Sequence, residues 1–89
     1  DFVRNHSIID ISPNPVTTSL SATIQIDVVT FADICIYDMK GIKQLTLYHD
    51  KIQPGKTTFN QQINLPAGQY VLSIHSNEGL RWKKFIVVN

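Results

Sequence analysis

The chain has 89 residues, enough for one folded domain and too few for two. Its 43% hydrophobic content is ordinary, whereas its 17% charged content is below the usual share of about a quarter, which excludes a disordered chain and a solvated helical bundle. Eight Lys and Arg against seven Asp and Glu leave a net charge of +1, too small to indicate nucleic acid or an anionic membrane as partner.

The start of the chain, Asp1-Phe2-Val3-Arg4, has no initiator Met and no signal-peptide pattern. We therefore expect a fragment of a longer protein, with any N-terminal targeting signal in the part that precedes it. No stretch approaches the roughly 20 apolar residues of a membrane-spanning helix. Residues 1–7 are interpreted as a linker and residues 8–89 as the domain.

Apolar residues recur with a period of two, the spacing of a half-buried β-strand, and no window shows the spacing of an amphipathic helix. The segment Thr23–Val28 alternates strictly, which predicts that Ile24, Ile26 and Val28 share one face. In chain order, the predicted strands are 7–12, 20–28, 32–38, 43–49, 57–63, 69–76 and 81–88.

Turn-forming residues separate these strands. Proline cannot donate a ladder hydrogen bond, so Pro13-Asn14-Pro15 ends the first strand. Further turns are predicted at Asp38-Met39-Lys40-Gly41, Gln53-Pro54-Gly55-Lys56, Leu65-Pro66-Ala67-Gly68 and Asn77-Glu78-Gly79.

Seven short strands with a turn about every 8–12 residues predict an all-β fold, an immunoglobulin-like antiparallel β-sandwich. Its core is expected to contain the inward residues of each strand: Ile9, Ile11, Leu20, Ile24, Ile26, Ile34, Ile36, Leu45, Leu47, Phe59, Ile63, Tyr70, Leu72, Ile74, Phe85 and Val87.

Nothing in the sequence has the pattern of a catalytic or metal site. The single cysteine, Cys35, lies in an apolar run, which predicts a buried, inert thiol and excludes a disulfide within the domain. The serines lack a nucleophile elbow, and Glu78 lies in a turn. We therefore expect no enzyme activity, no metal and no cofactor. The groups considered as metal ligands, none at the required spacing, are His6, His49, His75, Asp33, Asp38 and Asp50.

The run Arg81-Trp82-Lys83-Lys84 allows three interpretations. Basic residues beside an aromatic ring can bind a nucleic acid strand. An exposed Trp82, together with Tyr48, could instead form a carbohydrate-binding or adhesin surface. Lysines on a terminal strand also protect an exposed sheet edge from aggregation, and the small net charge favours this third interpretation.

Four segments follow one another along the chain: a P-N-P element, a strand with Tyr-Asp and a turn glycine, an L-P-A-G-x-Y element and a terminal basic-then-apolar strand. Taken in order, they resemble the type A C-terminal sorting domain of the type IX, or Por, secretion system of Bacteroidota. One departure is Ile42, where the family usually has a basic residue, with Lys43 as a substitute. The resemblance covers about residues 8–89, and its first three segments contribute Pro13, Asn14, Pro15, Tyr37, Asp38, Gly41, Pro66, Gly68 and Tyr70.

The resemblance implies a non-catalytic delivery role, without a cofactor, nucleic acid or direct membrane insertion. Such a domain follows a cargo protein into the periplasm, where the outer-membrane translocon of the type IX system recognises it. A sortase-like cysteine protease of that system then removes it, and the cargo is released or stays at the cell surface, attached to lipopolysaccharide.

Within that role, we expect the terminal strand to be the surface that the translocon recognises, through its side chains or by β-augmentation of its edge. The motif residues have a structural role instead; Tyr70 is predicted to form a tyrosine corner. A surface-displayed binding module and a spacer beside a catalytic domain stay open as alternatives. The recognition candidates are Lys83, Lys84, Phe85, Ile86, Val87, Val88 and Asn89.

Overall fold

The computed structural model describes residues 7–13, 15–77 and 79–88, so that His6, Asn14, Glu78, Asn89 and most of the expected linker lie outside the described part. Among the described residues there is no helix that could cross a bilayer. The strands are β1 (Ser7–Ser12), β2 (Ser19–Ile26), β3 (Thr30–Asp38), β4 (Lys43–Ile52), β5 (Gly55–Gln62), β6 (Gly68–Ser76) and β7 (Gly79–Val87).

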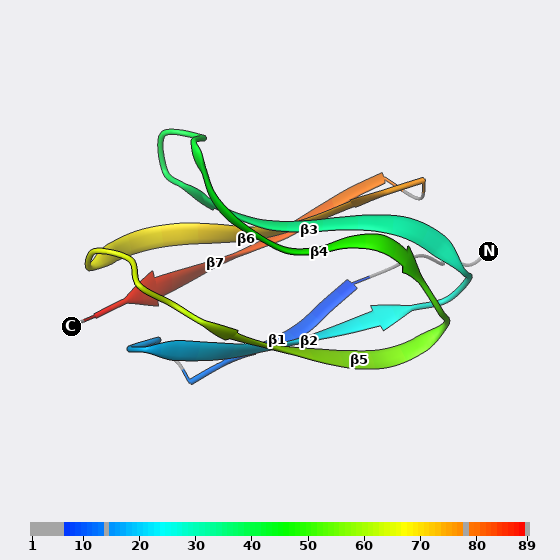
Figure 1. Ribbon diagram of the computed structural model, residues 1–89, viewed down its shortest axis with the longest axis horizontal. Helices are drawn as coiled ribbons and strands as arrows, with labels where there is room; N and C mark the ends of the chain where they lie inside the picture. Colours follow the sequence, from blue (N-terminus) through cyan, green and yellow to red (C-terminus); the bar gives the residue numbers. More distant parts are fainter. Residues whose placement is uncertain (1–6, 14, 78, 89) are drawn as a thin grey trace.

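These strands form two antiparallel sheets that pack face to face, which confirms the predicted β-sandwich (Figure 1). The first sheet has the order β1-β2-β5, and the second has the order β4-β3-β6-β7. Because β3 and β6 are the inner strands of the larger sheet, each is hydrogen-bonded on both sides.

The core lies between the sheets, where the alternation of each strand turns one set of side chains inward. Most of the expected core residues are buried, while Leu45, Leu47 and Phe59 are partly buried at its margin. The burial of Ile9 lies outside the described part. The core also contains residues that the periodicity did not predict, namely Val16, Ala22, Ala32 and Ile52.

Several strand ends differ from the prediction by one to three residues, and two of these differences bear on burial. The strand expected over 20–28 ends at Ile26, and Val28 is 47% exposed, so the expectation that Val28 shares the buried face was wrong. The chain leaves the sheet at Asp27 to cross to β3, which frees the side chains that follow. By contrast, β4 runs beyond residue 49 to Ile52, which is buried.

The segment between β1 and β2 joins the two sheets. Val16 forms a parallel bridge with Val87 of β7: Val16 N donates to Ile86 O and Val88 N donates to Val16 O, both at 2.8 Å. Val16 is fully buried. The residue that directly follows Pro15 therefore closes one end of the sandwich.

Truncation of a fully buried side chain tests this core. Leu72 on β6 is 0% exposed, and we expect Leu72→Ala to lower the free energy of unfolding by about 2–5 kcal/mol because it leaves a cavity. The control Ile42→Ala removes a side chain that is 57% exposed and should change it by less than about 0.5 kcal/mol. Urea denaturation measures both, and equal losses would contradict the assigned core.

Candidate functional site

The outer face of the four-stranded sheet is built from rows of paired residues that run across its strands. The middle row is Thr46, Cys35, Ser73 and Trp82 in the order β4-β3-β6-β7. Larger or charged side chains flank its small Cys35 and Ser73. The neighbouring row on one side consists of His49, Asp33, His75 and Leu80. The neighbouring row on the other side consists of Lys43, Tyr37, Val71 and Lys84.

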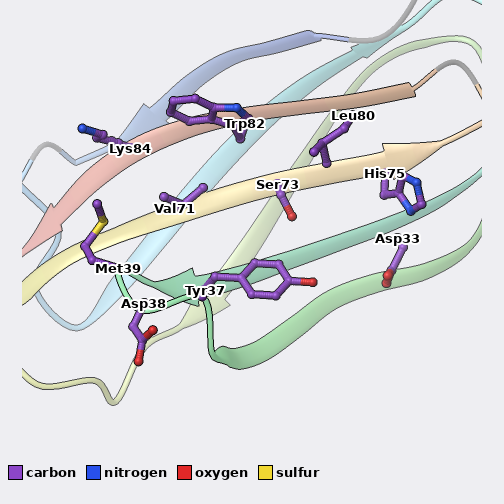
Figure 2. A pocket seen from close by; sticks show the side chains of 11 residues that line it. Asp33, Tyr37, Asp38, Met39, Val71, Ser73, His75, Leu80, Trp82 and Lys84 are labelled. Carbon is purple, nitrogen blue, oxygen red and sulfur yellow. The ribbon is translucent and has the colours of Figure 1, made fainter.

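These rows enclose a groove of about 520 Å³ on the outer face. Ser73 lies near its middle, Trp82 and Leu80 border it from β7, and Tyr37 borders it from β3 (Figure 2). The turn residue Met39 lies at the end nearest Lys84 (Figure 2). Periodicity indicates which residues face outward, but not that they surround a hollow, so this groove could not be predicted from the sequence.

One end of the groove carries a small polar cluster. His49 Nδ1 lies 3.1 Å from Asp33 Oδ1, and Cys35 Sγ donates to the same oxygen at 3.3 Å. The hydrogen bond with His49 lowers the pKa of Asp33, against the opposing effect of burial. Burial raises the pKa of the Cys35 thiol, and Cys35 is buried, as predicted.

The motif residues Asp38 and Gly41 build the β3–β4 turn at the other end. The Asp38 carboxylate accepts hydrogen bonds from Lys40 N and Ile42 N, both at 2.9 Å, and from Gln44 Nε2 at 3.1 Å. Gly41 has a φ of 87°, a conformation that a side chain disfavours. These two residues therefore shape the turn that carries Met39.

Tyr70 forms the predicted tyrosine corner. Its hydroxyl donates to Pro66 O at 2.7 Å, and its ring stacks on Phe85 with centroids 6.0 Å apart. Gly68, with a φ of 156°, starts β6 beside this ring. The L-P-A-G-x-Y element thus anchors the corner to the terminal strand.

The terminal strand displays some recognition candidates and buries others. Phe85 and Val87 are 5% and 1% exposed and belong to the core, whereas Lys83, Lys84 and Ile86 are exposed. Val88 is half-buried. In the folded domain, a partner can therefore reach only the exposed side chains of this strand.

Among the described residues, the outer edge of β7 is hydrogen-bonded to another segment only near its end. Val16 occupies Ile86 O and Val88 N, so the even-numbered residues direct their main-chain groups outward. By the same alternation, the main-chain groups of Leu80, Trp82 and Lys84 face outward, and no strand among the described residues pairs with them there.

The other sequence candidates do not come together. Tyr48 packs inward on Phe59, with ring centroids 5.1 Å apart, whereas Trp82 is 58% exposed on the outer face, so these two rings do not form one binding surface. Asp33 and Asp38 lie near opposite ends of β3, and the Asp50 carboxylate accepts from Lys51 N. Within the described residues, no group of three or more His, Cys, Asp or Glu could hold a metal ion.

Comparisons with known proteins bear on both family and fold. A family model described as the secretion system C-terminal sorting domain matches residues 10–89. A crystal structure of a selenomethionine-labelled β-glucosidase from Kluyveromyces marxianus is similar with a TM-score of 0.62 at 15% identity, over 96% of this chain and 14% of that one. At this identity the likeness shows the fold alone. No curated protein matches the chain.

Removal of one hydroxyl tests the tyrosine corner. Tyr70→Phe keeps the stacked ring and deletes the hydrogen bond to Pro66 O, so we expect the free energy of unfolding to fall by about 0.5–1.5 kcal/mol. Tyr37→Phe is the control, because the Tyr37 hydroxyl makes no hydrogen bond within the described residues; its effect should stay below about 0.5 kcal/mol. Chemical denaturation compares the two, and equal effects would contradict a role for the hydroxyl.

The lowered pKa of Asp33 predicts a pH dependence. Because the folded pKa lies below the unfolded value near 3.8, the carboxylate stabilises the fold above that pH, and this contribution is lost as the pH falls through the folded pKa. Asp33→Asn should lower stability at pH 7 by at most about 1 kcal/mol, and the difference should shrink as the pH falls below 3.8. Urea titrations across pH 2–7 measure this; a pH-independent difference would contradict it.

Proposed function

Because the chain belongs to the family of secretion system C-terminal sorting domains, we propose that it directs an attached cargo protein across the outer membrane through the type IX secretion system. The observation that carries this proposal is the family match over residues 10–89, which spans nearly the whole chain. A protein that carries such a sorting domain is exported.

The recognition surface in this proposal is the terminal strand. Lys83 and Lys84 are adjacent residues of an extended strand, so their side chains leave opposite faces, and both are exposed. Phe85 and Val87, which follow these lysines, are buried and hold the strand against the core. This combination supports a strand that is rigid enough to be recognised and still accessible.

The uncovered edge of β7 offers a second means of recognition. A strand from the outer-membrane translocon could pair with the outward main-chain groups of Leu80, Trp82 and Lys84, since strand addition needs an edge without a neighbour. Val16 already covers the end of this edge. We therefore place the pairing before residue 86.

The later steps follow the family's delivery role. The cargo lies N-terminal to the domain and crosses the periplasm with it. A sortase-like cysteine protease then cleaves the junction, which we assign to residues 1–7, where the chain enters β1. The cargo is released or stays at the cell surface, and the domain itself carries out no chemistry.

A secretion assay tests this function. A fluorescent protein with a periplasmic signal peptide is fused ahead of residues 1–89 and expressed in a bacterium with a working type IX system. We expect the fusion at the cell surface, and retention in the periplasm when residues from Phe85 onward are deleted. Cell fractionation and surface protease digestion measure the distribution.

Because this deletion removes core residues, a folded variant is needed beside it. The double substitution Lys83→Glu and Lys84→Glu reverses exposed charges and should lower surface delivery several-fold while the melting temperature is kept. Lys56→Glu, on the exposed face of β5, is the matched control and should deliver normally. Normal surface delivery of the fusion deleted from Phe85 would overturn the proposed function.

A further inference from the structure

The outer faces of the two sheets differ in chemistry. On the three-stranded sheet, the outward side chains of β2 and β5 are polar, as is usual for a sheet face that meets water. They bond to one another: Ser21 Oγ donates to Asn60 Oδ1, and the Thr23 and Thr58 hydroxyl oxygens lie 3.0 Å apart. The chain therefore follows the ordinary pattern on that face.

The four-stranded sheet departs from this pattern around the groove. Leu80, Trp82 and Met39 are 54%, 58% and 52% exposed, and they border the groove together with Val71 and Tyr37 (Figure 2). Apolar side chains gathered in this way on one face of a small domain mark a contact surface.

A buried hydroxyl in the groove lacks a partner. Ser73 is 8% exposed, lines the groove, and makes no side-chain hydrogen bond within the described residues. Buried polar groups in folded proteins are ordinarily hydrogen-bonded. An occupant that carries a donor or acceptor, such as a peptide group, would satisfy this hydroxyl.

The charged groups of the groove differ in their partners, because the two carboxylates are hydrogen-bonded within the domain and the lysine is not. Asp33 is bonded to His49 and Cys35, and the Asp38 carboxylate accepts from the main chain of its own turn. Lys84 lines the same end as the turn and forms no ion pair within the described part of the chain. A carboxylate of an occupant at this end would therefore give Lys84 an ion-pair partner.

We propose that this groove binds an extended segment of a partner protein, with apolar side chains at alternate positions and a carboxylate that meets Lys84. The groove follows β6 from Val71 to His75, about 13 Å, which accommodates about four or five extended residues. Its volume of about 520 Å³ lies within the usual range of ligand sites. The inference rests on the proposed function, since a sorting domain is recognised by a protein, and it adds a contact beside the β7 edge.

A glycan fits the same groove less well. Sugar hydroxyls need several free polar side chains around an aromatic ring, but neither Asn nor Gln lines the groove and both of its carboxylates are engaged. Trp82 instead shares the groove with the apolar side chains of Leu80, Val71 and Met39. The glycan is therefore one of the outcomes that the test distinguishes.

A binding titration tests the proposal on the whole chain. The probe is the synthetic peptide acetyl-Glu-Val-Ser-Leu-Thr-Leu-amide, which lacks aromatic residues, so that the fluorescence of Trp82, the one tryptophan of the chain, reports occupancy. We expect a saturable change in fluorescence, and we expect Lys84→Gln to weaken the affinity about two- to fivefold. Trp82→Ala should weaken the affinity about tenfold or more. Because this variant has lost the fluorescent reporter, its binding is measured by NMR chemical shifts. Val28→Ser, an exposed apolar site at the opposite turn, should bind normally.

Three results would overturn the proposal. The first is the absence of a saturable change with this peptide, and the second is equal binding of peptides in which Glu becomes Gln or the apolar residues become Ser. The third is saturable binding of cellohexaose, or self-association of the chain in sedimentation, in place of binding to the peptide. Thermal melting of each variant verifies folding, which is expected because the substituted side chains are exposed.

The secretion assay separates this proposal from the function on which it rests. We expect Trp82→Ala combined with Val71→Ser to lower surface delivery several-fold, with Val28→Ser unchanged. If that double variant is delivered normally while deletion from Phe85 blocks delivery, the groove proposal fails and the sorting function stands. If the deleted fusion is itself delivered normally, the sorting function fails.

Discussion

The burial of β3 and β6 in the core between the two sheets is the interaction on which the rest of this domain depends. Ile34 and Ile36 of β3, and Leu72 and Ile74 of β6, are fully buried. The one cysteine makes no disulfide, so apolar contact rather than a covalent link holds the sheets together. Because neighbouring residues of a strand point to opposite faces, this burial also determines the residues on the outer face.

The groove and the terminal strand both follow from that alternation. With Ile34 and Ile36 inside, Cys35 must lie outside, where it pairs in a row with Ser73 and Trp82. Small residues in this row leave space between larger neighbours. On β7, the buried Phe85 and Val87 likewise leave Lys84 and Ile86 outward, so the strand is anchored and displayed by the same periodicity.

Much of this arrangement could be predicted from the sequence. The strands, the sandwich, the buried Cys35 and the corner formed by Tyr70 follow from local patterns, because period and turn residues are properties of short segments. The burial of Val16 could not be predicted in this way. It depends on contact with β7, which lies about seventy residues further along the chain.

The sequence by itself determined the fold class, the family motifs and which side chains alternate along each strand. Only the tertiary structure decided which strands are neighbours, and therefore that Cys35, Ser73 and Trp82 form one row, that Asp33 meets His49, and that Tyr48 and Trp82 lie apart. The physical reason is that periodicity assigns a side chain to a face, whereas a groove or an edge exists only once strands distant in sequence are paired in register.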